Sequence, residues 1–271
     1  MGSWTLDDIP WQRFDPTRLD PKIVSLAKAA SLVEYNGAAY ARHLCRVFAG
    51  DSAFQQSARC WGEEEVQHGM ALARWAMLAD PDFDFDAAFA RFQSGYRIDF
   101  DRMFARRGSQ AGEMLARCIV ETGTSSFYTA LREAAAEPVL REICHHIAAD
   151  ELRHYRLFYK NLGACLVRER LGRWARLKIA LGRIAESEDD ELAYAYYAAN
   201  AADTAYDRQR CSRAYASRAF AIYRPHHIER GVAMILKAVG FTPNGWLGRT
   251  LARLSWQAMR WRFSRSAREA A

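Results

Sequence analysis

The stretch Ala148-Ala149-Asp150-Glu151-Leu152-Arg153-His154 contains a Glu and a His three residues apart. The same spacing recurs at Glu65 and His68. On an α-helix, residues three positions apart lie on one face, one turn above the other. Each pair therefore presents a carboxylate and an imidazole to the same neighbour.

Each pair also has a single glutamate about thirty residues upstream, Glu34 before Glu65 and Glu121 before Glu151. A four-helix bundle that holds two metal ions needs one Glu from each of two helices and a Glu-x-x-His pair from each of the other two. A solvated, charged helix face often explains one such pair, whereas both pairs with both upstream glutamates favour a dimetal site over that alternative. The sequence therefore predicts six metal ligands, which are Glu34, Glu65, His68, Glu121, Glu151 and His154.

These donor types indicate which metals the site would take. Carboxylates and neutral imidazoles suit iron and other first-row ions, and carboxylates can bridge two cations. We predict two Fe ions, with Mn/Fe as the alternative that the same ligands allow, and O2 as a co-substrate. Glu34, Glu65 and His68 are assigned mainly to one metal, and the other three ligands mainly to the second.

Each predicted histidine ligand is preceded by a second acid, four positions earlier. These acids are Glu64 and Asp150. An acid at that position can accept the proton of a ligating imidazole on a facing helix, which fixes the tautomer of the ring. We expect Asp150 to reach His68 and Glu64 to reach His154.

Composition places the chain in the all-α class. The chain has 271 residues, half of them apolar, and only seven prolines. Long segments lack Gly and Pro punctuation, which is typical of helices. We expect an N-terminal arm over 1–20, a ferritin-like four-helix bundle over 21–164 and a basic helical extension over 165–271 that packs on the bundle.

Capping residues and breaks give the expected helices. Asp20-Pro21 and Asp51-Ser52 are helix starts, and Asp80-Pro81-Asp82 is a break. The expected helices span 21–50, 51–79, 85–107, about 110–136 and 138–164, and further breaks are expected near Ser187, at Arg224-Pro225 and at Pro243-Asn244-Gly245. The helix over 85–107 would be the long crossover between the two halves of the bundle.

The net charge of +6 is concentrated in two runs. Arg168–Arg183 holds six basic residues against one acid, and Arg249–Arg268 holds six arginines and no acid. Within the second run, apolar residues at helical spacing begin at Leu247 and end at Trp261. Such a basic amphipathic helix can bind a membrane surface or an acidic protein. Packing on the bundle is the simpler interpretation.

Other sequence features narrow the setting. The six cysteines have no Cys-x-x-Cys spacing, no secretory signal is recognisable, and no apolar run has the length of a membrane span. We expect a cytoplasmic protein, with peripheral membrane contact as an option. No motif for reading nucleic acid is present, so a nucleic-acid partner is not expected. A homodimer is compatible with the sequence.

Two motifs resemble those of the soluble acyl-carrier-protein desaturases. The segment 143–154 resembles their second metal motif, Asp-Glu-x-Arg-His, and Glu64–Gly69 resembles their first, Glu-Glu-x-Arg-His-Gly, with Gln67 in place of the Arg. Glu121-Thr122-Gly123-Thr124 is similar to the ligand Glu of that family followed by a Thr. The ligand order is also shared by aldehyde-deformylating oxygenases and tRNA hydroxylases of the ferritin-like superfamily.

The resemblance implies a di-iron oxygenase or oxidase that acts on an apolar substrate, such as an acyl chain on an acidic carrier protein, with an external electron donor. It implies that Thr124 assists O2 activation. From the residues alone, the Thr124 hydroxyl can equally bond back to its own helix. Two alternatives remain open, a ferritin-type ferroxidase and a ferritin-like binding protein without turnover.

Overall fold

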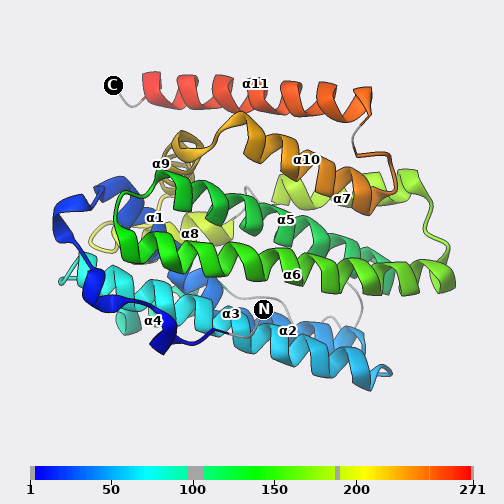
Figure 1. Ribbon diagram of the computed structural model, residues 1–271, viewed down its shortest axis with the longest axis horizontal. Helices are drawn as coiled ribbons and strands as arrows, with labels where there is room; N and C mark the ends of the chain where they lie inside the picture. Colours follow the sequence, from blue (N-terminus) through cyan, green and yellow to red (C-terminus); the bar gives the residue numbers. More distant parts are fainter. Residues whose placement is uncertain (1–3, 97–106, 187–189, 244, 270–271) are drawn as a thin grey trace. The chain divides into compact units, whose positions relative to one another are not determined.

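The chain forms helices and no β-strand over the residues that the computed structural model describes, which are 4–96, 107–186, 190–243 and 245–269. The prediction of an all-α protein is confirmed (Figure 1). Contacts divide the chain into two compact units. The first comprises Met1–Met103, Arg132–His146 and Glu188–Arg218, and the second comprises Phe104–Leu131, Ile147–Ser187 and Ala219–Ala271. The predicted division at 20 and 164 stays a prediction.

The first unit is built around α3 (Ser52–Ala79). Both α1 (Pro21–Tyr35) and α2 (Gly37–Val47) pack against α3. In turn, α8 (Asp190–Asn200) packs against α1 and α4 (Phe85–Gly95). A segment far along the chain therefore completes a unit that the first hundred residues begin.

Two helix starts in this unit follow the predicted capping residues. The Asp20 carboxylate accepts a hydrogen bond from Lys22 N at 2.8 Å, and the Asp51 carboxylate accepts one from Phe54 N at 2.9 Å. Each bond satisfies an amide that the first helical turn leaves without a partner. The predicted starts of α1 and α3 are confirmed.

The predicted single helix over 21–50 is wrong, because the chain breaks directly after the turn that carries Glu34. Asn36, with φ −77° and ψ 1°, ends α1, and Gly37 begins α2. A Cβ at Gly37 would collide with Cβ of Glu65 on α3. Glycine lets the backbone approach α3 closely and weakens the helix at that point. This break was not predicted because it depends on the contact with α3.

Other predicted boundaries hold in part. The crossover helix α4 ends at Gly95 rather than 107, and residues 97–106 lie outside the described residues. Tyr96 is already extended. The predicted break near Ser187 falls largely on residues 187–189, which also lie outside the described range.

The second unit contains α7 (Arg173–Glu186), α10 (Pro225–Val239) and α11 (Trp246–Glu269), and α10 packs against both of the others. Two longer helices, α5 (Gln110–Ala134) and α6 (Pro138–Glu169), and also α9 (Arg208–Ile222), contribute residues to both units. Within the second unit, the Tyr155 hydroxyl of α6 donates to Met234 O of α10 at 2.8 Å. The predicted boundary at Arg224-Pro225 is confirmed.

Each unit has its own apolar core. The largest fully buried side chains of the first unit are Trp75, Phe48, Phe92, Leu26, Leu32, Leu44 and Leu72, and those of the second are Tyr128, Phe158, Met114, Leu115 and Leu131. Burying such side chains contributes about 1.5–3 kcal/mol each. These cores hold the helices that carry the predicted ligands.

Gly69 tests how closely α1 approaches α3, and Gly163 on α6 serves as the control. A Cβ at Gly69 would collide with the backbone of Tyr35, whereas a Cβ at Gly163 in α6 would meet nothing within 4 Å. We expect Gly69→Ala to lower the free energy of unfolding by about 1–3 kcal/mol. Gly163→Ala should raise it by up to about 1 kcal/mol, because alanine favours a helix interior. Urea denaturation of both variants measures the difference. Equal effects would contradict the close helix approach.

Candidate metal centre

The first unit contains one predicted half of the site, formed by Glu34 on α1 and by Glu65 and His68 on α3. One ligand atom from each lies within 4.8 Å of the others. His68 Nδ1 is 3.9 Å from Glu34 Oε2. All three residues are buried, with exposed fractions of 5%, 7% and 0%. We call these three residues the first half-site.

The second unit contains the matching half. Glu121 on α5 and Glu151 and His154 on α6 also offer ligand atoms within 4.8 Å of one another. His154 Nδ1 lies 3.7 Å from Glu121 Oε2 and 3.9 Å from Glu151 Oε2. Each residue is 1% exposed. We call this group the second half-site, and its three residues are those assigned to one metal from the sequence.

Burial makes the negative charge of the second half-site unfavourable. It raises the pKa of the Glu121 carboxyl above its ordinary value, and the nearby charge of Glu151 raises that pKa further. The bond to His154 acts in the opposite direction. A buried carboxylate needs a proton, a positive charge or donors of hydrogen bonds. These clusters of buried acids and imidazoles can hold a metal ion.

Glu137 shows how the same fold satisfies a buried carboxylate that has a purely structural role. This residue is 2% exposed and precedes α6. Its Oε2 accepts hydrogen bonds from Trp75 Nε1 and Leu140 N, both at 2.7 Å. Its Oε1 accepts from Asp15 N and Val139 N, both at 3.2 Å. N–H donors therefore replace the lost hydration of Glu137.

Thr124 lies beside the second half-site. Its hydroxyl is 2.6 Å from Glu151 Oε2 and donates to that carboxylate. The same hydroxyl lies 3.3 Å from the backbone oxygens of Val120 and Glu121. The contacts with Val120 and Glu121 fit a hydroxyl that bonds back to its own helix, and the contact with Glu151 fits a hydroxyl that acts at the site. The bond to Glu151 fixes the orientation of a predicted ligand. A role in O2 activation stays a prediction.

The two acids predicted to support the histidine ligands, Asp150 and Glu64, differ in their surroundings. Asp150 is buried, and its Oδ1 forms an ion pair with Arg153 at 2.6 Å. This pair gives Arg153 a contact that the sequence did not predict. Glu64 is half-buried on α3. The predicted contacts of Asp150 with His68 and of Glu64 with His154 stay predictions.

Trp4 is a neighbour of the first half-site that sequence reasoning missed. Its ring is 6% exposed and stacks on the His68 imidazole, with ring centroids 6.0 Å apart and planes 5° apart. The Trp4 carbonyl accepts a hydrogen bond from Gln67 Nε2 at 2.9 Å. Trp4 therefore shields one face of a predicted ligand. Nothing in the local sequence pattern identifies this contact, because it joins the N-terminal arm to α3.

Glu191 on α8 is a second acid that the ligand pattern missed. Asn200 Nδ2 donates to Ser25 O at 3.1 Å, which sets the register between α8 and α1. Glu191 lies nine residues before Asn200, and Glu34 lies nine residues after Ser25, so antiparallel packing brings the two acids to the same level. The charge of Glu34 accordingly raises the pKa of Glu191.

The Glu191 carboxylate is costly to bury in the metal-free chain. Its Oε1 is shielded from solvent and has no hydrogen-bond partner among the described residues, although the residue as a whole is only half-buried. Burial, followed by the charge of Glu34, raises the pKa of Glu191 to about 8. Glu191 does not belong to the close cluster of the first half-site. Its charge nevertheless acts on a predicted ligand, Glu34.

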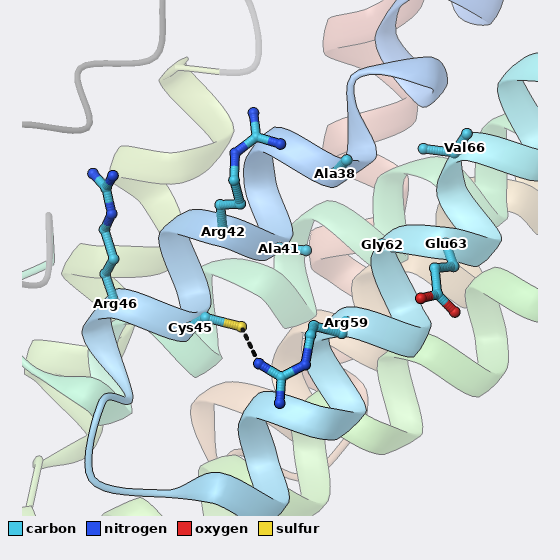
Figure 2. Close-up of a pocket in the computed structure, with 9 residues that line it drawn as sticks. All are labelled: Ala38, Ala41, Arg42, Cys45, Arg46, Arg59, Gly62, Glu63 and Val66. Atoms are coloured by element: carbon cyan, nitrogen blue, oxygen red, sulfur yellow. Dashed lines mark hydrogen bonds between the residues drawn. The ribbon is translucent and has the colours of Figure 1, made fainter.

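A pocket of about 510 Å³ lies between α2 and α3 (Figure 2). Ala38, Ala41 and Val66 give it apolar walls, and three arginines line it as well, Arg42, Arg46 and Arg59. Arg59 also contacts Cys45 Sγ at 3.9 Å. Gly62, Glu63 and Val66 belong to the turns of α3 that flank Glu65, so the pocket borders the helix of the first half-site. Its lining thus combines apolar side chains with three arginines and one glutamate.

Comparison of the chain with models of known protein families finds no match, and comparison with curated proteins finds none either. The resemblance to the desaturases therefore rests on the motifs quoted above. The geometry of the two half-sites is independent of that resemblance.

The raised pKa values of Glu121 and Glu191 predict how stability depends on pH. A carboxyl whose pKa is higher in the folded chain stabilises that chain at low pH, and this contribution is lost as pH rises from about 4.5 to about 8. We expect the unfolding temperature of the metal-free protein to fall by at least about 2–4 °C across this range. Added Fe(II) or Co(II) should cancel the fall. Differential scanning fluorimetry measures both curves, and a rise of the metal-free curve would contradict the prediction.

Replacement of Glu191 tests its part in metal binding. Glu191→Gln should stabilise the metal-free protein at about pH 8 by removing a buried charge. The same change should weaken Co(II) binding about 10-fold, within the range found for residues that support metal ligands. Titration followed by Co(II) absorption gives the affinity. Glu63→Gln on the exposed side of α3 is the control, and equal affinities of the two variants would exclude Glu191 from the site.

Proposed function

We propose that this chain is a non-haem di-iron oxygenase or oxidase that uses O2 to oxidise an apolar organic substrate. In this proposal α1, α3, α5 and α6 form a ferritin-like four-helix bundle, and the two half-sites combine into one centre with two iron ions. The observation that supports it most is the duplication of the half-site. Each has two buried glutamates and one buried histidine, with the Glu-x-x-His pair on one helix and the single Glu on another.

The ligand set accounts for the burial of so much negative charge. Four glutamates would neutralise four positive charges, which is the charge of two Fe(II) ions. The buried imidazoles of His68 and His154 would bind as neutral donors. When bound, a pair of Fe(II) ions supplies electrons to O2 in a multi-electron step that amino-acid side chains cannot perform.

The chain's own residues would then orient the ligands and exclude water. The Thr124 hydroxyl donates to one oxygen of Glu151 and so restrains the orientation of that carboxylate. The indole of Trp4 covers the His68 ring on one side. Restriction of water around a metal site strengthens the electrostatic interactions inside it. Because Thr124 bonds to Glu151 and matches the Thr of the desaturase motif, it is the residue for which we propose a role during O2 activation.

The desaturase-like motifs and the pocket between α2 and α3 support the proposed substrate class. An acyl chain has the apolar part that the alanines and Val66 would accept, and its acidic head or carrier would be attracted by three arginines. We include an acidic carrier protein and an external electron donor among the proposed partners. Mn/Fe remains the alternative metal pair.

A ferritin-type ferroxidase would use the same ligands without an organic substrate. The two functions differ in what O2 oxidises, because a ferroxidase turns over Fe(II) repeatedly. An acyl oxidase consumes O2 beyond the bound iron only when it has reductant and substrate. O2 consumption with excess Fe(II) alone, measured beside consumption with a fatty acid and reductant, separates the two.

Anaerobic loading tests the proposed centre. The wild-type chain should bind two Fe(II) per chain and give an O2-dependent absorbance change. Glu151→Gln should bind one Fe(II) or none and lose that change, because a neutral amide replaces a ligand charge. Iron analysis after gel filtration and stopped-flow absorption are the measurements.

Glu63→Gln is the matched control for the loading experiment, since Glu63 is exposed on α3 and belongs to neither half-site. It should retain both iron ions. Full iron occupancy in Glu151→Gln, or no iron binding by the wild-type chain, would overturn the proposal.

A further inference from the structure

Large apolar side chains that are exposed to solvent gather in the second unit. Among the described residues there are twelve, and three of them, Met70, Met77 and Leu78, lie on α3. The other nine come from the end of α6, from α7 and from α11, and they are Val167, Trp174, Leu181, Ile184, Trp246, Leu247, Leu251, Leu254 and Trp261. Apolar patches on a protein surface commonly mark interaction sites.

α11 has an apolar stripe on a face that does not pack on α10. Leu247, Leu251, Leu254 and Trp261 follow one another at intervals of four, three and seven residues, which places them on one face of the helix. Their exposed fractions are 36%, 36%, 56% and 63%. The buried side chain of Ala252, with its neighbour Gly248 one turn earlier, lies on a different face. The expectation that the C-terminal extension packs on the bundle stays a prediction.

The charged residues of α11 from Trp246 to Arg268 are all arginines. Its exposed surface includes Arg249, Arg253, Arg260 and Arg262, and the sequence has no acid between Trp246 and Arg268. Two such helices would repel each other in a symmetric contact between two copies. The complementary partner is a negatively charged surface that also accepts apolar side chains.

α7 repeats the combination of exposed apolar and basic residues. Trp174, Leu181 and Ile184 are 77%, 57% and 39% exposed. Trp174 and Leu181 lie in the other basic run, Arg168–Arg183, and Ile184 directly follows it. α7 and α11 both pack on α10, and the Trp174 ring meets the Phe241 ring that follows α10. Two helices of one unit therefore have the same surface chemistry.

We infer that α11, together with α7, is a docking surface for a membrane that contains anionic lipid. The stripe from Leu247 to Trp261 is about 21 Å long at 1.5 Å per residue, and Trp246 and Trp261 lie at its two ends. Tryptophan favours the interface between headgroups and acyl chains, and arginine binds anionic headgroups. Among the described residues no helix is long and apolar enough to cross a membrane. α11 would therefore lie in the plane of the interface.

An acidic protein is the main competing partner, and the distribution of side chains favours lipid. An acidic protein would need a groove whose shape matches the stripe on α11. The large side chains at the two ends of the stripe and on α7 would add little to binding in such a groove. A lipid interface accepts all of these side chains without a matching shape. This inference does not depend on the proposed oxygenase function, because it uses no residue of either half-site.

Sedimentation of the full chain with lipid vesicles tests the inference. Vesicles of phosphatidylcholine with about one third phosphatidylglycerol should carry the protein down, and vesicles of phosphatidylcholine alone should bind it at least about 10-fold more weakly. Binding to the anionic vesicles should weaken as salt is raised, because salt screens the arginines.

A pair of variants assigns that binding to α11. Leu254→Glu should reduce binding to anionic vesicles at least about 10-fold, because it places a charge in the stripe. Leu254 is largely exposed, so the variant should keep the unfolding temperature of the wild type. Leu78→Glu makes the same change at a residue that is 44% exposed on α3 and should bind as the wild type does.

Three outcomes would overturn the inference. These are equal binding to both kinds of vesicle, an unchanged affinity of Leu254→Glu, and no binding to vesicles at all. Sedimentation velocity without lipid additionally measures the oligomeric state of the protein. A wild-type dimer that Leu254→Glu dissociates, without vesicle binding, would assign the stripe to a contact between two copies instead.

Discussion

The fold has to accommodate glutamates that are buried close to one another. Removing a carboxylate from water is costly, and placing a second one nearby adds repulsion. Both half-sites carry this free-energy cost of burying neighbouring carboxylates, and both lie on helices that the apolar cores hold in place. Glu137 shows that the chain can satisfy a buried carboxylate with N–H donors where no other function is required. In each half-site, a bound cation would offset the charge of the neighbouring buried glutamates.

The sequence predicted the elements that depend on local chemistry. The Glu-x-x-His spacing is a property of one helix, so the pairs Glu65/His68 and Glu151/His154 could be recognised without knowledge of the fold. The caps Asp20 and Asp51 act within three residues of themselves, and the starts of α1 and α3 follow from them. The single glutamates were found only because the order of the ligands is repeated.

Contacts between distant segments could not be predicted in this way. The break at Asn36 depends on the fit of Gly37 against α3, and the place of Glu191 depends on the register of α8 on α1. The Trp4 ring stacks on His68, and the Trp4 carbonyl is held by Gln67, which stands where the resembling desaturase motif has an arginine. A neutral amide there binds a backbone carbonyl, so this departure from the motif has a structural consequence for the surroundings of a predicted ligand.

The interleaving of the two units affects the order in which the chain can fold during synthesis. α8 belongs to the first unit but emerges after α6 and α7, and the last helices of the second unit follow it. α1 therefore cannot pack against α8 until more than 150 further residues have been synthesised. Contacts of such long range in the sequence form slowly. Until α8 arrives, the side of α1 that it covers stays open to water. A nascent chain stalled before residue 190 would thus be a candidate for chaperone binding.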